Sequence, residues 1–158
     1  MERIIKSAVK LLIGAGKVTA TIEIAYCDGD DAVKTRSEAT LVYDGTEYRG
    51  QGNDYLLTDT LADLQMKLLE DVQLACCMTC RHGNMCPYGN TPDQLFCTKD
   101  IRITSKGDMC DLFDKTNPFE QRAVALFGYC EDFVCQSNDC YTYNDYLYQL
   151  EEKRAANR

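Results

Sequence analysis

Cysteine is the residue type that dominates the potential chemistry of this chain, with ten copies in 158 residues. Two of them form the element Cys77-Met78-Thr79-Cys80, and Arg81-His82-Gly83 follows directly. In metal knuckles this spacing lets two thiolates bind one ion, while backbone N–H groups donate hydrogen bonds to the sulfurs and a nearby glycine permits the tight turn. The motif therefore predicts that Cys77 and Cys80 bind a metal ion together.

Further ligands are needed, because tetrahedral Zn²⁺ takes four. Cys97 and Cys130 each lie beside a helix-end signal, so separate rigid elements can project their sulfurs toward the pair. The predicted zinc ligands are Cys77, Cys80, Cys97 and Cys130. Cys86 and Cys110 are the reserves. We interpret the other cysteines as small buried hydrophobic residues; they are Cys27, Cys76, Cys135 and Cys140.

Two other uses of these thiols stay open as alternatives. One is an iron–sulfur cluster, because Cys80 is followed by Cys86-Pro87 and ferredoxin ligand runs also end in Cys-Pro. The spacing departs from that pattern, since ferredoxins place the third cysteine much closer to the second. A redox dithiol at Cys77 and Cys80 is the other. Thioredoxin-like pairs open a helix, whereas this pair follows a predicted helix.

Catalysis by the common hydrolytic machineries is disfavoured. His82 is the single histidine, and beside Arg81 in a polar loop we expect it to be solvated rather than a ligand or base. The run Gly14-Ala15-Gly16-Lys17 lacks the Walker spacing. A site of four thiolates also leaves no open coordination position for water. We therefore expect a non-catalytic protein with a structural zinc ion.

The charge balance limits the partners, since 17 Lys and Arg face 25 Asp and Glu, for a net charge of −8. This sign is wrong for binding a phosphate backbone, so nucleic acid is not expected. No stretch is long and apolar enough to span a membrane, and the N-terminal segment lacks an export signal. We expect a cytoplasmic protein whose cysteines stay reduced.

An unidentified protein is the expected partner of the acidic surface, where Tyr141 and Tyr148 provide contact area. As an alternative, the acidity itself is the function, in an inhibitor or immunity-type protein that covers a basic partner.

The elements before the cysteines are predicted from hydrophobic periodicity. Residues 2–13 have a helix-compatible pattern that Gly14 ends, and residues 18–26 alternate like a half-buried strand. Asp44-Gly45 suits a type I′ turn between strands over 38–43 and 46–49, which predicts a small antiparallel sheet.

A long amphipathic helix over residues 54–74 is predicted from apolar residues spaced by three and four, and it would end at the Cys76-Cys77 pair. Thr91-Pro92-Asp93-Gln94 predicts a single turn before Cys97. Asn117-Pro118 predicts the start of a helix that ends at Gly128. The buried stripe of that helix would be Phe119, Ala123, Leu126 and Phe127.

A C-terminal helix capped near Thr142 completes the chain, with Tyr143, Tyr146, Leu147 and Leu150 on one face. The predicted fold is one α+β domain over residues 1–158: a small antiparallel sheet, a long amphipathic helix, a cysteine-rich metal-binding loop insert at about 76–135, and C-terminal helices.

Several separated elements occur in an order that resembles a bacterial family of small cysteine-rich proteins whose function is not established. They are Leu61-x-x-Leu64-Gln65-x-x-Leu68, Cys76-Cys77-Met78-Thr79-Cys80-Arg81-His82-Gly83, Phe96-Cys97, Lys106 and Cys130-Glu131-Asp132-Phe133. The resemblance covers about the middle half of the chain. It implies that Cys77, Cys80, Cys97 and Cys130 form the grouped set, and it implies no activity. Cys86 and Cys110 depart from the pattern, which leaves a second or different metal arrangement open.

Overall fold

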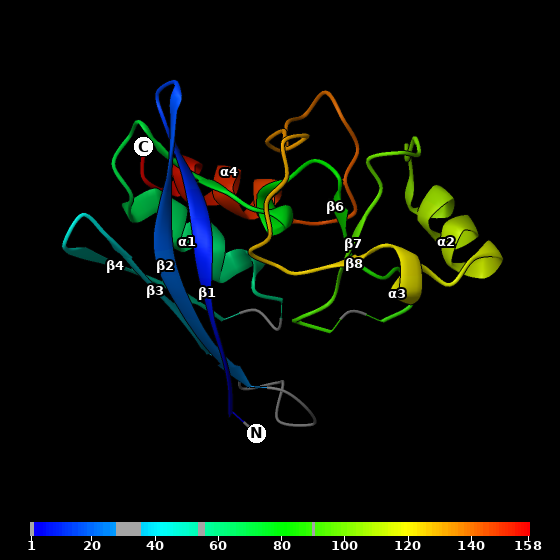
Figure 1. Ribbon diagram of the computed structural model, residues 1–158, viewed down its shortest axis with the longest axis horizontal. Helices are drawn as coiled ribbons and strands as arrows, with labels where there is room; N and C mark the ends of the chain where they lie inside the picture. Colours follow the sequence, from blue (N-terminus) through cyan, green and yellow to red (C-terminus); the bar gives the residue numbers. More distant parts are fainter. Residues whose placement is uncertain (1, 28–35, 54–55, 90) are drawn as a thin grey trace.

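An antiparallel sheet forms the N-terminal part of the computed structural model, which describes residues 2–27, 36–53, 56–89 and 91–158. In these residues the sheet has five strands in the spatial order β4-β3-β2-β1-β5, and it is strongly curled (Figure 1). The strands are β1 (Glu2–Ile13), β2 (Gly16–Cys27), β3 (Ser37–Tyr43), β4 (Thr46–Gly52) and β5 (Val72–Ala75). The fold is mixed α+β, as the sequence predicts.

The first predicted helix is wrong, because residues 2–13 form strand β1 along the whole length of β2. The segment has apolar residues at both helical and alternating spacings, and Val9 and Leu11 point inward as alternation requires. Cross-strand pairing with β2 decides between the two periods, since strand preference depends on packing against neighbouring strands. Gly14, with φ of +57°, lies in the hairpin turn rather than at a helix end.

The predicted strands over residues 18–26, 38–43 and 46–49 are all confirmed. Residues 18–26 lie within β2, with Ile22 and Ile24 fully buried. Asp44 and Gly45 join β3 to β4 with φ values of +51° and +73°, which is the pair of positive φ angles that a type I′ turn requires.

The long helix is much shorter than predicted, because α1 spans only Thr58–Lys67. Leu68 is already extended, and the chain turns back to form β5, which pairs with β1. Helix α1 lies directly on β4: a Cβ atom at Gly50 would stand 2.5 Å from the backbone nitrogen of Leu64. This approach requires glycine, since real Cβ atoms do not come so close to backbone.

Short elements fill the chain after β5. They are the 3₁₀ turn η2 (Cys77–Thr79) and the strands β6 (Gly83–Asn84), β7 (Leu95–Cys97) and β8 (Ala123–Val124), which form a sheet in the order β6-β7-β8. The predicted turn before Cys97 is present, as the Gln94 N–H donates to the Thr91 carbonyl at 3.2 Å.

Helix α2 (Lys106–Lys115) was not predicted, although Ser105 caps it by accepting a hydrogen bond from the Asp108 N–H. Helix α3 (Pro118–Gln121) starts at the expected proline but stops after one turn, because the chain then pairs with β7 as β8. The predicted stripe is therefore half wrong: Leu126 and Phe127 are buried, whereas Phe119 and Ala123 are exposed.

Helix α4 (Tyr146–Ala156) begins four residues later than the predicted cap and packs against α1 near the sheet, whereas α2 and α3 lie at the far end of the molecule (Figure 1). One hydrophobic core runs from the sheet through α1 and α4 into the cysteine-bearing segment, where it includes Cys76, Met78 and Met85. A second small cluster lies beneath α2, around Met109. No helix in the described ranges has the length and apolar character to cross a membrane.

Candidate functional site

The turn that holds Cys77 and Cys80 is fixed by hydrogen bonds on both sides. The Thr79 hydroxyl accepts from the Cys76 N–H at 3.2 Å and donates to the Leu74 carbonyl at 3.1 Å, so η2 is tied to the end of β5. The Cys77 N–H donates to the Gly128 carbonyl at 2.8 Å, and the Cys80 N–H closes the turn on the Cys77 carbonyl at 3.3 Å. The turn is thus anchored both to the adjacent end of β5 and to the distant segment at Gly128.

Cys97 comes to this turn through strand pairing. It ends β7, where it lies opposite Gly83 of β6, and its N–H donates to the Arg122 carbonyl at 2.8 Å. A Cβ atom at Gly83 would stand 2.0 Å from the Cys77 carbonyl oxygen. The glycine after the Cys-x-x-Cys element is therefore needed for close backbone contact with the turn itself.

Cys130 comes from the loop after β8, two residues beyond Gly128. That glycine lies against the turn as well, since a Cβ atom on it would be 3.4 Å from the Cys77 sulfur. Cys130 is exposed, whereas Cys77 and Cys97 are half-buried and Cys80 is buried. The solvent exposure of the four cysteines thus increases from Cys80 in the core to Cys130 at the surface.

All four predicted cysteines line the same cavity, of about 20 Å³. A volume of this size holds about one water molecule, which is also the scale of a single ion. The remaining wall is formed by His82, Gly83, Lys99, Val124, Gly128, Tyr129 and Phe133. Cys77, Cys97 and Cys130 also line a larger open hollow of about 650 Å³.

The sulfurs are not arranged as a finished coordination sphere. Within the ranges that the structure describes, no group of three or more His, Cys, Asp or Glu side chains is placed so that it could hold a metal ion. What the fold brings together is therefore a set of four thiols around one small space, without ligand geometry.

Burial sets the electrostatics of the two thiols on the turn, Cys77 and Cys80. It raises the pKa of Cys77 to about 12, and the neighbouring cysteine sulfurs act in the same direction. Burial also raises the pKa of Cys80, while hydrogen bonds from the backbone N–H groups of His82 and Val134 to its sulfur oppose the rise. Without a cation in the cavity, the neutral thiol is favoured.

His82 lies closer to the site than the sequence indicates. It was expected to be solvated, yet it lines the cavity beside Lys99. Burial, followed by the charge of Arg81, lowers its pKa below the ordinary value. The neutral imidazole is thereby favoured.

The reserve ligands do not line this cavity. Cys86 is buried elsewhere, and Cys110 lies on α2. Of the cysteines interpreted as core residues, Cys76 is fully buried, while Cys27, Cys135 and Cys140 are only partly buried. All ten cysteines fall within the described residues, and all are free thiols.

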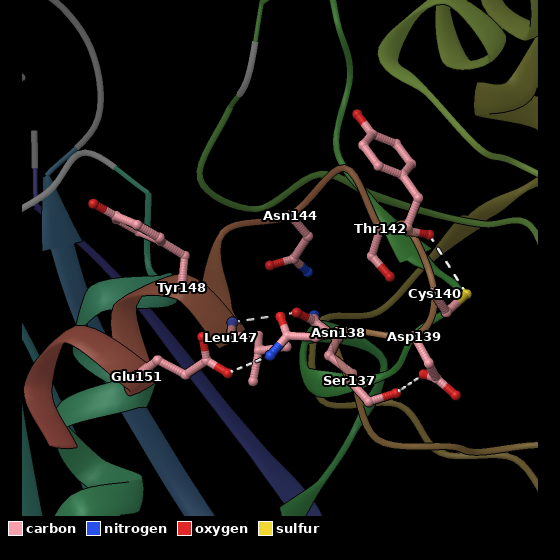
Figure 2. Close-up of a pocket in the computed structure, with 11 residues that line it drawn as sticks. Ser137, Asn138, Asp139, Cys140, Thr142, Asn144, Leu147, Tyr148 and Glu151 are labelled. Carbon is pink, nitrogen blue, oxygen red and sulfur yellow. Dashed lines mark hydrogen bonds between the residues drawn. The ribbon is translucent and has the colours of Figure 1, made fainter. Parts of the chain in front are cut away.

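A second hollow, of about 420 Å³, lies between the loop at 136–144 and helix α4 (Figure 2). Its polar groups pair with one another: the Asn138 amide donates to Glu151 at 2.7 Å, and the Leu147 N–H donates to Gln136 at 3.3 Å. These contacts explain the loop's conformation without a ligand. The cysteine cavity is the stronger candidate site.

The comparisons with known proteins add no relative. No protein-family model matches this chain, and no curated protein matches it. The resemblance to small cysteine-rich bacterial proteins therefore stays a prediction, and the geometry of the cysteine cavity is what bears on function.

Proposed function

We propose that this is a non-catalytic zinc-binding protein of the cytoplasm, in which four thiolates hold one structural Zn²⁺. The ligands are Cys77, Cys80, Cys97 and Cys130. The observation that carries the proposal is that these four residues, from three separate stretches of the chain, line one cavity of single-ion size. A zinc ion there would join η2, the end of β7 and the loop after β8.

Binding requires the sulfurs to close in, because they do not have ligand spacing in the described structure. Cys130 is exposed and lies in a loop, so its side chain is the one that has most freedom to turn inward. The cation would also reverse the protonation preference of the buried thiols, since a bound metal deprotonates its thiol ligands.

Several features favour zinc over the alternatives. The backbone groups of His82 and Val134 act to lower the pKa of the Cys80 thiol, and backbone hydrogen bonding of this kind supports thiolate ligands in zinc sites. A cavity of about 20 Å³ suits one ion better than an iron–sulfur cluster of several atoms. Four protein ligands leave no position for a reactive water, so the metal would be structural.

The expected partner is another protein, which would contact the acidic surface. The net charge is −8, and Tyr148 is exposed by more than half, whereas Tyr141 is only partly exposed. Tyr88, which was not predicted to take part, is also exposed by more than half. Aromatic residues on a charged surface are typical of contact sites. A basic partner would be retained at low salt and released at high salt, because rim charges are screened.

Elemental analysis tests whether the protein contains zinc. Protein purified under reducing conditions, without added metal, should contain one zinc and no iron per chain. Cys97→Ser should lose most of the bound zinc in competition with a chromophoric chelator, whereas the matched control Cys140→Ser should keep it. A chain that contains no zinc and binds none when titrated would refute the proposal, and iron with visible absorption would support the cluster alternative.

A further inference from the structure

Cys80 has a second neighbour that is not one of the proposed zinc ligands. An isolated antiparallel bridge pairs it with Cys135. The Arg81 N–H donates to the Val134 carbonyl at 2.8 Å, and the Gln136 N–H donates to the Thr79 carbonyl at 3.1 Å. These bonds flank the two cysteines on either side, so the cysteines form a non-hydrogen-bonded pair.

This kind of pair is the closest that an antiparallel ladder provides. Its Cα atoms stand about 4.5 Å apart, and the side chains of directly opposed residues lie on the same face. Disulfides span Cα separations of roughly 4.4–6.8 Å. The backbone at Cys80 and Cys135 therefore has a spacing that an S–S bond can bridge.

Side chains fix this register. The Gln136 amide donates to the Met78 carbonyl at 3.1 Å, and its oxygen accepts from the Leu147 N–H at 3.3 Å, which ties the Cys135 strand to both η2 and α4. The Arg81 guanidinium donates to the Ser137 hydroxyl at 3.1 Å.

We propose that Cys80 and Cys135 form a redox-active pair that a low-molecular-weight disulfide oxidises to an intramolecular disulfide. One cysteine thiolate attacks the small disulfide, forms a mixed disulfide and releases one small thiol. The other cysteine thiolate then attacks the mixed disulfide and releases the second small thiol. The protein loses two protons and two electrons, and the small disulfide gains them.

The consequence for the metal rests on the proposed function. Cys80 lines the cavity, and its sulfur cannot serve as a thiolate ligand while it is bonded to Cys135. Each disulfide formed would therefore remove one ligand from the site and release the zinc. Bound zinc, in turn, would slow the oxidation, because it occupies the sulfur that must react.

The competing product is a disulfide within the Cys-x-x-Cys element itself. Cys77 and Cys80 lie at the two ends of one turn, and both line the same cavity. The cross-strand proposal predicts that Cys80 pairs with Cys135 in preference to Cys77.

The experiment treats the full reduced protein with oxidised glutathione and stops the reaction by alkylation. Mass spectrometry of unreduced proteolytic fragments then identifies the linked cysteines, and a chromophoric chelator follows zinc release. We expect the Cys80–Cys135 link as the main product, with one zinc released per link. Cys135→Ser should release zinc at least about tenfold more slowly than the wild type, and Cys140→Ser at the wild-type rate. Cys135→Ala provides a second variant, in case the serine variant does not fold.

The outcomes separate the two proposals. A main product that joins Cys77 to Cys80, or only glutathione adducts, overturns the cross-strand pair while leaving zinc binding intact. Unchanged zinc release in the Cys135 variants also overturns it. A Cys80–Cys135 link in a protein that contains no zinc supports the pair and refutes the metal site.

Discussion

Two regions of the molecule are stabilised in different ways. The sheet–helix region, which is β1 to β5 with α1, has two strands of 12 residues in continuous register. The cysteine-rich region, residues 76–145, has strands of only two or three residues, joined by loops and by the helices α2 and α3. Regular pairing extends through most of the first region and little of the second.

The source of stability differs accordingly. The largest fully buried side chains of the sheet–helix region, such as Ile24 and Leu61, pack between the sheet and its helix. The cysteine-rich region also buries large side chains, among them Phe96 and Met78, but single polar side chains hold much of its backbone. The Asn144 amide, for example, donates to the Met78 and Gly83 carbonyls at 2.8 and 3.0 Å. Ordering each loop residue costs about 1–2 kcal/mol, so a region with little regular pairing gains most from a cross-link such as a metal.

Zinc removal should have the largest effect, and it should separate the two regions. Zinc binding to small thiolate domains contributes on the order of 10 kcal/mol. A strong chelator should therefore abolish hydrogen-exchange protection in residues 76–145, while β1, β2 and β3 stay protected. An equal loss of protection in both regions, or no loss in either, would contradict the idea that zinc stabilises only the cysteine-rich region. Exchange measured by mass spectrometry reports each region separately.

Leu61→Ala should destabilise the sheet–helix region by about 2–5 kcal/mol, because it leaves a cavity under a fully buried side chain. Urea unfolding monitored by circular dichroism measures this change. The exposed Val42→Ala provides a control with a much smaller effect. Zinc affinity should be unchanged in folded Leu61→Ala, and a large fall in affinity would show that the two regions are not separable.

Gly83→Ala should destabilise the cysteine-rich region by about 1–3 kcal/mol, because the new methyl group would stand 2.0 Å from the Cys77 carbonyl oxygen. It should weaken zinc binding as well, since β6 must move away from the turn. Gly107→Ala is the matched control, as its nearest neighbouring atom would be 3.5 Å away. Chelator competition compares the two variants, and equal affinities would argue against the role of this close contact.

Lys67→Ala should have the smallest effect. The Lys67 ammonium contacts Asp63 one turn earlier on α1 at 2.8 Å, and half of its side chain is exposed. Exposed pairs of this kind contribute about 0.3–0.5 kcal/mol. Thermal unfolding should show that the variant is slightly less stable than the wild type at low salt and equally stable at high salt. A loss of stability of several kcal/mol would give this pair an unexpected structural role.

Local signals in the sequence predicted local structure well. Asp44-Gly45 specified its own turn, because the positive φ angles are a property of those two residues. The Cys-x-x-Cys spacing likewise placed Cys77 and Cys80 on one turn. Cys97 and Cys130 line the same cavity as that turn, although the helix signal used for Cys130 was wrong, as β8 replaces most of that helix.

Pairing between distant segments decided which of the ambiguous stretches became strands. Residues 2–13 were compatible with either a helix or a strand, and only their partner β2 made them a strand. Val72 continued the helical spacing of leucines, yet it lies on β5 because β1 offers an unpaired edge there.

The sequence by itself determined the composition of the site: many thiols, one Cys-x-x-Cys turn, and too few histidines for common hydrolytic chemistry. Only the tertiary structure decided which distant residue faces Cys80. Cys135 carries no motif, and no local pattern connects it to a residue 55 positions earlier. Strand register is set by contacts along both strands together, so a cross-strand neighbour becomes visible only once both segments have folded.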